Sequence, residues 1–159
     1  MKIRLDFVSN SSSSSYIVIC TDGIETYNFN YQNIQLPAFE HGTSQFDWEV
    51  RDIYDIWSKL NFCALQLLLL KDIQDRNDEY SKKCNWNGSY YRCYNMFVDV
   101  CKDILHLDPI IVDDNKSFID HQSCVTENAN MEMFESKEQL IAFLTSRNSY
   151  IHTDNDNHG

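Results

Sequence analysis

The sequence predicts an α+β fold in which N-terminal antiparallel strands pack on a leucine-rich central helix, with two further helices and short strands after residue 108. The first thirty residues contain two segments of alternating apolar and polar side chains and one short apolar run, which are typical of strands. In the middle of the chain and near its end, apolar residues recur every three or four positions, which is typical of helices. A length of 159 residues, with four glycines and two prolines, predicts a single domain over 1–159.

Strands are predicted before any helix. Residues 2–8 alternate charged and apolar side chains, and 16–20 form a short apolar run suited to a central strand. The connection between them, 9–15, is a serine-rich loop. Residues 26–31 alternate again and predict a third strand after a turn, whereas we expect 32–47 to be irregular.

Two helices are predicted in the middle of the chain. From Trp48, apolar residues recur at three- and four-residue spacing and predict one long helix through about residue 76. The run Leu67–Leu70 makes its second half apolar nearly all round, so we expect it to be the central buried helix. A second helix follows the Asn87-Gly88 turn, with an apolar stripe from Tyr94 to Leu105.

Short strands and one more helix are predicted in the last third of the chain. Ile110–Val112 reads as a buried strand, and Phe118-Ile119 as another short one. The capping box Ser136-x-x-Gln139 begins the last helix. Tyr150–His152 predicts a final strand, after which 153–159 forms a polar tail.

The charge balance is strongly acidic. Thirteen Lys and Arg against 24 Asp and Glu give a formal net charge of −11. Because nucleic-acid binding requires Lys and Arg to neutralise phosphates, we expect no direct nucleic-acid binding. The acidity suits docking on a basic protein surface, or simply a solvated acidic surface.

The sequence predicts a cytoplasmic protein without a membrane segment. The N-terminal residues lack the continuous apolar stretch of a signal peptide, and the longest apolar run, Phe62–Leu70, is too short to span a bilayer. Six cysteines without a Cys-x-x-Cys pair indicate free thiols in a reducing compartment, although the spacing leaves a Cys84–Cys93 bridge open.

Asp120 and His121 are the strongest candidates for catalytic residues, because a histidine beside a carboxylate can act as a base or a metal ligand. Adjacent residues rarely orient each other's side chains, so catalysis would need a partner from elsewhere in the chain. The candidates are Glu49, His41, His152 and the Asp154/Asp156 pair. The simpler interpretation is a polar loop whose groups are satisfied by hydrogen bonds.

Glu49 is the second candidate for chemistry, since Phe46-Asp47-Trp48-Glu49 places a carboxylate between large aromatic residues. Such surroundings could raise its pKa toward that of a general base. In the simpler interpretation Asp47 caps the predicted helix, Glu49 favours its positive end and Trp48 packs.

The serine run and the tail are candidates for partner recognition rather than for cofactor binding. The serine run lacks the glycines and the lysine of a phosphate-binding loop, and the tail lacks the later ligands of a calcium loop. We therefore predict no metal and no cofactor. The residues expected to contact a partner are Ser11, Ser12, Ser13, Trp48, Asp154 and Asp156.

The string Asp6-Phe7-Val8-Ser9-Asn10-Ser11-Ser12-Ser13-Ser14-Ser15-Tyr16 resembles the N-terminus of a loosely defined, mostly uncharacterised group of small bacterial and phage or mobile-element proteins. The likeness continues at Phe46–Glu49, Ile119–Ser123 and Ser149–Asn157. The resemblance implies a small accessory protein of Firmicutes-like bacteria or their phages, and it carries over no catalytic role.

Two functional hypotheses follow. The first is an acidic interaction protein that docks on a basic partner. By analogy of setting and charge, that partner could be a host-defence nuclease such as a CRISPR effector. The second is a small hydrolase or nuclease-like enzyme that uses Asp120 and His121 with Glu49.

Overall fold

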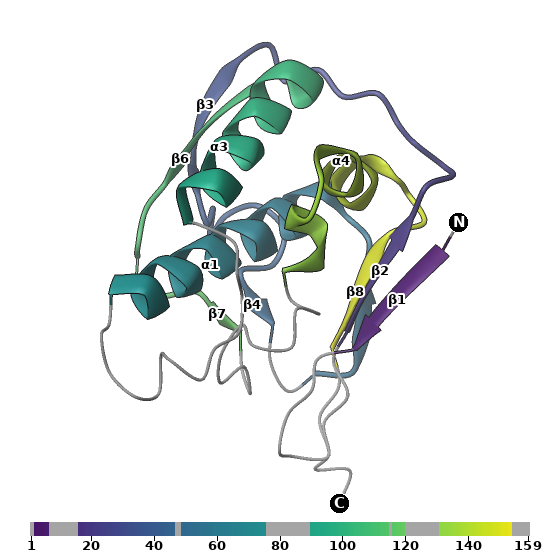
Figure 1. Cartoon of the computed structure of the whole chain (residues 1–159), viewed down its shortest axis with the longest axis horizontal. Coiled ribbons are helices and arrows are strands. Elements are labelled where there is room, and N and C mark those ends of the chain that lie inside the picture. Colours follow the sequence, from purple (N-terminus) through teal and green to yellow (C-terminus); the bar gives the residue numbers. More distant parts are fainter. Residues whose placement is uncertain are drawn as a thin grey trace, which may run out of the picture.

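The computed structural model describes residues 2–6, 16–46, 49–75, 90–114, 116–119 and 131–153, and for 2–6 and Phe118 the backbone alone. It confirms the predicted α+β class (Figure 1). The strands are β1 (Lys2–Asp6), β2 (Tyr16–Cys20), β3 (Gln32–Leu36), β4 (Gln45–Phe46), β5 (Arg51–Ile53), β6 (Leu107–Ile111), β7 (Phe118–Ile119) and β8 (Tyr150–Thr153). The helices are α1 (Ile56–Asp75), α3 (Tyr90–Val100) and α4 (Lys137–Thr145), with a π-helical turn η1 (Cys101–Leu105) and a 3₁₀ turn η2 (Glu132–Phe134).

An antiparallel sheet in the order β1-β2-β8-β5 forms one side of the molecule (Figure 1). Its inner face carries Ile17, Ile19, Ile53 and Ile151, which are all part of the hydrophobic core. Helix α4 packs on this face against β2. Successive strand residues point to opposite faces. The strand residues that directly precede or follow these isoleucines in sequence therefore lie on the outer face of the sheet.

Helix α1 crosses the centre of the fold, as expected, but it is buried on every side in its first half, over Ser58–Leu67. In the leucine-rich second half, only Leu70 and Ile73 are buried after Leu67. Its start differs from the prediction. The helix begins at Ile56 rather than at Trp48, because Arg51–Ile53 pair with β8 as a strand. Asp55 caps the helix instead, since its Oδ2 accepts a hydrogen bond of 2.8 Å from the Ser58 amide.

A loop over residues 38–43 is fastened to this helix start. The Asn61 side chain, which is fully buried, accepts from the Ala38 amide at 2.7 Å and donates to the carbonyls of Ala38, His41 and Thr43 at 3.3, 2.8 and 3.0 Å. Gly42 has φ +64°, and a Cβ there would lie 2.6 Å from the Ser58 amide nitrogen. The close approach therefore requires glycine.

The third predicted strand is wrong. The alternating residues before Gln32 are not a strand, because Asn30 and Tyr31 adopt left-handed backbone angles of φ 52° and 56° that break an extended chain. The strand begins at Gln32 and pairs in parallel with β6, with Gln32 opposite Leu107. The expected irregular region thus contains β3 and also β4, which pairs in parallel with β7.

The later elements follow the predictions more closely. The second helix runs from Tyr90 through the π-helical turn to Leu105, and His106 ends it at φ 51°. The capping box is confirmed, because the Ser136 hydroxyl accepts from the Gln139 amide at 3.1 Å. Strands β7 and β8 lie where short strands are expected.

Several expectations fall outside the described residues. These are the serine-rich loop 9–15, the Asn87-Gly88 turn, the tail from 154 onward and the thiols of Cys84 and Cys124. In the described part of the chain Cys20, Cys63 and Cys101 are buried free thiols. None of the described helices has the length and apolar composition that a membrane span requires.

Candidate interaction site on the outer face of the sheet

Most of the residues singled out from the sequence lie outside the described residues. These are Ser11, Ser12, Ser13, Trp48, Asp120, His121, Asp154 and Asp156. Glu49 is described, and its side chain is 73% exposed. Its Oε2 lies 3.5 Å from Nη1 of Arg51, so the carboxylate belongs to a surface ion pair. The catalytic hypothesis for these residues therefore stays a prediction.

The described residues next to these segments lie at one end of the sheet. The register aligns Asp6 with Tyr16, Tyr16 with His152, and His152 with Asp52 in one row across the four strands. The serine run precedes Tyr16 in sequence, and the polar tail follows β8. The sheet thus gathers the ends of segments that are far apart along the chain.

Arg51 ties this end of the sheet to β4 and β7. Its Nη2 donates to the Gln45 carbonyl at 2.8 Å, and Phe46 in β4 pairs with Ile119 in β7. On the other side, the Thr153 hydroxyl donates to the Glu49 carbonyl at 2.5 Å. Glu49, Ile119 and Thr153 are the described neighbours of Trp48, Asp120 and Asp154 in sequence. These hydrogen bonds and this strand pairing therefore link the segments that carry the three residues.

The outer face of the sheet carries a group of polar aromatic side chains at this end, which we call the tyrosine face. Its members are Tyr16, Asp52, Tyr54, Tyr150 and His152. Nδ1 of His152 lies 2.6 Å from Oδ1 of Asp52, and the Tyr16 ring stacks on the imidazole with centroids 4.6 Å apart. The Tyr150 ring contacts Tyr54 at 4.9 Å and Tyr16 at 6.5 Å.

Burial and nearby charge raise the pKa of two phenols of this face, Tyr54 and Tyr150. Partial burial, followed by the charge of Asp52, raises the pKa of Tyr54, which is still 48% exposed as a residue. Partial burial also raises the pKa of Tyr150, with further contributions from Tyr16 and Asp52. Both phenols are protonated at neutral pH, as a phenol of ordinary pKa also is, and the Tyr150 hydroxyl shares a side-chain hydrogen bond with Tyr16.

The two other histidines that were considered as partners of His121 lie in different parts of the structure. His152 belongs to the tyrosine face, where Asp52 and not a neighbour in sequence holds its ring. His41 is exposed and stacks on Trp57 at the start of α1, with ring centroids 5.0 Å apart. Sequence reasoning named His152 but missed Asp52, because the two are 100 residues apart and meet through strand pairing.

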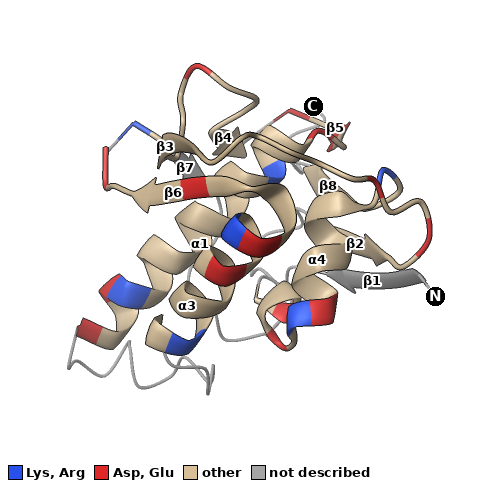
Figure 2. Cartoon of the chain, turned by 90° about the horizontal axis from the view of Figure 1, so that it is seen from above, with Lys and Arg blue, Asp and Glu red and all other residues tan. Residues whose placement is uncertain are grey.

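Basic and acidic side chains are intermixed over the described part of the chain (Figure 2). Figure 2 shows the Lys and Arg residues of the described chain scattered over helices and loops, some of them directly beside Asp or Glu. A continuous basic stripe is the usual footprint of nucleic-acid binding. Among the described residues, no group of three or more His, Cys, Asp or Glu side chains could hold a metal ion.

No protein family, curated protein or solved structure matches the chain.

Proposed function

We propose that the chain is a small acidic cytoplasmic interaction protein that docks on a basic protein surface through the tyrosine face. The observation that supports this proposal best is the set of three tyrosines on the outer face of the sheet next to the Asp52–His152 pair. Tyrosine is enriched among the residues that dominate binding energy at protein interfaces, because it buries a large ring and keeps a hydrogen-bonding group.

Charge supports the same proposal. A net charge of −11 attracts a basic surface over a distance and raises the rate of association. Asp52 is 46% exposed at its side chain and offers a carboxylate for an Arg or Lys of the partner. By analogy of setting and charge, the proposed partner is a nuclease of a bacterial defence system, such as a CRISPR effector, whose nucleic-acid groove is basic. The chain would then be of phage or mobile-element origin.

The proposal predicts a strong dependence of association on salt. We expect the purified chain to retain a basic protein from a Firmicutes lysate, and mass spectrometry identifies that protein. The association rate constant should fall about tenfold or more between 0.1 M and 1 M salt, because the Debye length shrinks from about 10 Å to about 3 Å. If a CRISPR effector is retained, its DNA cleavage should fall in proportion to the bound fraction.

Association at the same rate in both salt concentrations would contradict electrostatic docking, and so would a partner without a basic surface. The hydrolase hypothesis is separate from this test. The hydrolase hypothesis predicts a hydrolytic activity of the purified chain that is lost in a His121→Ala variant. The interaction proposal predicts that partner association in this variant depends on salt as it does in the wild-type protein.

A further inference from the structure

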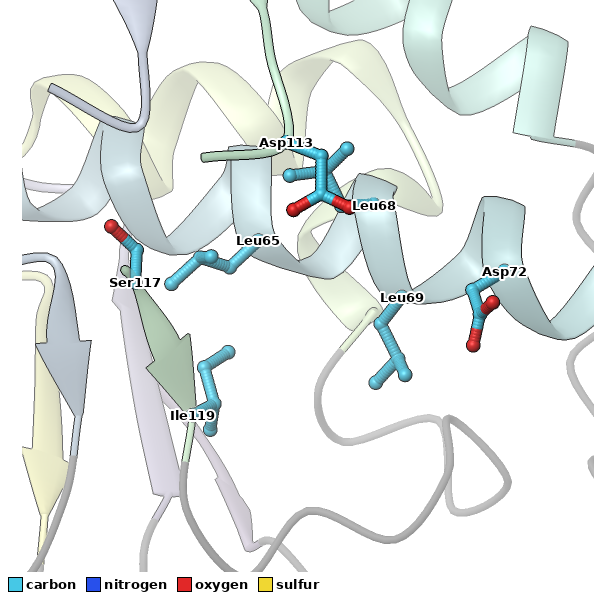
Figure 3. Close-up of a pocket in the computed structure, with 7 residues that line it drawn as sticks. All are labelled: Leu65, Leu68, Leu69, Asp72, Asp113, Ser117 and Ile119. Atoms are coloured by element: carbon cyan, nitrogen blue, oxygen red, sulfur yellow. The ribbon is translucent and has the colours of Figure 1, made fainter. Parts of the chain in front are cut away.

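A half-open pocket of about 350 Å³ lies between α1, the chain that follows β6, and β7 (Figure 3). Its lining residues are Leu65, Leu68, Leu69, Asp72, Asp113, Ser117 and Ile119. None of them belongs to the tyrosine face. The volume is at the lower end of the range that small-molecule pockets have.

The floor of the pocket is apolar and elongated. Leu65, Leu69 and Asp72 are spaced by four and three residues, so they follow one face of α1 over about 10 Å. Leu68 and Leu69 are only half-buried, in contrast to the buried leucines around them in the helix. Ile119 continues the apolar surface on the β7 side (Figure 3). An apolar ligand would therefore remove apolar surface from water.

The charged groups of the pocket are two carboxylates, one on α1 and one on the chain that follows β6. Asp72 lies on α1, and Asp113 lies on the chain that follows β6 (Figure 3). Both residues are exposed. Lys71, which precedes Asp72, places its ammonium group over the Tyr90 ring, 5.9 Å from the centroid. Two carboxylates on a strongly acidic chain give this site a negative potential, which favours cations and disfavours anions.

We propose that the pocket binds a hydrophobic cation, which is an ammonium or guanidinium group on an apolar stem. The stem lies along the leucines of α1 and against Ile119, and the charged group lies near Asp72 and Asp113. A stem of about six carbons matches a floor about 10 Å long. Both a free alkylamine and a Lys or Arg side chain of a partner have this chemistry. The proposal does not depend on the function proposed for the tyrosine face.

The test is a titration of methyl-labelled protein with n-hexylamine, followed by carbon-13 NMR. We expect the methyl resonances of Leu65, Leu68, Leu69 and Ile119 to shift in a saturable manner. Core methyl groups remote from the pocket, such as those of Ile17, should not shift. Hexanoate has a stem of similar length and the opposite charge, and we expect no saturable shift with it. Equal binding of hexanoate would overturn the proposal, as would shifts centred elsewhere.

Charge-neutral variants test the two carboxylates. We expect the D72N/D113N double variant to bind hexylamine about fivefold to tenfold more weakly. The matched control is Asp75→Asn, which removes an exposed carboxylate from the same helix but outside the pocket. An unchanged dissociation constant in the folded double variant would overturn the assignment.

A second ligand distinguishes the two sources of the cation. The probe is an acetylated Leu-Ala-Ala-Lys amide peptide, titrated in the same way as hexylamine. Tighter binding of the peptide supports the pocket as a subsite for a partner's side chain, and tighter binding of hexylamine supports a small amine. If neither ligand shifts the pocket methyl groups, the proposal is wrong.

Discussion

Replacing Asn61 by alanine is expected to lower the free energy of unfolding by about 2 to 4 kcal/mol. The fully buried amide makes four hydrogen bonds to the backbone of residues 38–43. Alanine removes all four and leaves the Ala38 amide and three carbonyls without this partner. Water can replace Asn61 at the exposed part of the loop, which limits the loss of unfolding free energy. The buried backbone groups of the loop lose their hydrogen bonds without replacement.

Urea unfolding followed by circular dichroism measures this effect. The matched control is Asn33→Ala, because Asn33 is exposed on β3 and should change the free energy of unfolding by less than about 0.5 kcal/mol. A loss below about 1 kcal/mol in the Asn61 variant would show that the loop is held by its other contacts, such as the Ser58 hydroxyl, which accepts from the Thr43 amide at 2.7 Å.

Lys59 gives the second large effect, as a dependence of stability on pH. Its side chain is 1% exposed, and Nζ donates to the Ser146 carbonyl at 2.9 Å. Burial lowers its pKa from 10.5 to about 8, although attraction by Asp55 and Glu25 opposes this change. Between these two values the unfolded chain binds more protons than the folded chain. The contribution of Lys59 to stability therefore rises with pH across this window.

The comparison that isolates this contribution is the wild-type protein against Lys59→Met. Burial raises the pKa of the Cys63 and Cys101 thiols, so both thiols titrate with the opposite sign to Lys59 in both proteins. The difference removes the contribution of Cys101 and most of that of Cys63, on whose pKa the charge of Lys59 is the smallest influence. From pH 7 to pH 10, we expect the difference in unfolding free energy to move in favour of wild type by about 2 to 3 kcal/mol. If the unfolding free energies of the two proteins changed in parallel with pH, the lowered pKa of the buried Lys59 would be refuted.

Elements with strong local signals could be predicted from the sequence. The apolar run 16–20 became the central strand β2, and the capping residue Ser136 begins α4 as expected. In both cases the residues that fix the element are next to each other in sequence. The leucines of α1 likewise indicated the central helix, since they leave no polar face.

Elements that depend on distant partners could not be predicted. β3 and β5 are short and partly polar, and their partners β6 and β8 lie about 75 and 100 residues further along the chain. The alternating residues before Gln32 carried the better local pattern, but two left-handed residues end any strand there. Tertiary pairing therefore outweighed local preference.

The site follows the same rule. His152 could be named from the sequence because histidine is a common catalytic and binding residue. Its carboxylate partner Asp52 and its stacking partner Tyr16 are brought to it by the sheet. The available signal was the alternation of 150–152, which places Tyr150 and His152 on one face. The buried polar residues Lys59 and Asn61 offered a similar signal, because a helix that is apolar all round must satisfy such groups internally.

The affinity of the identified partner for a Y54S/D52N double variant tests the proposed interaction most directly. Tyr91→Ser is the control, because Tyr91 is 73% exposed on α3, away from the tyrosine face. With both proteins shown to be folded, the double variant is expected to bind at least about tenfold more weakly, while the control stays within about twofold of wild type. Equal affinities of the double variant and the wild-type protein would contradict docking through the tyrosine face.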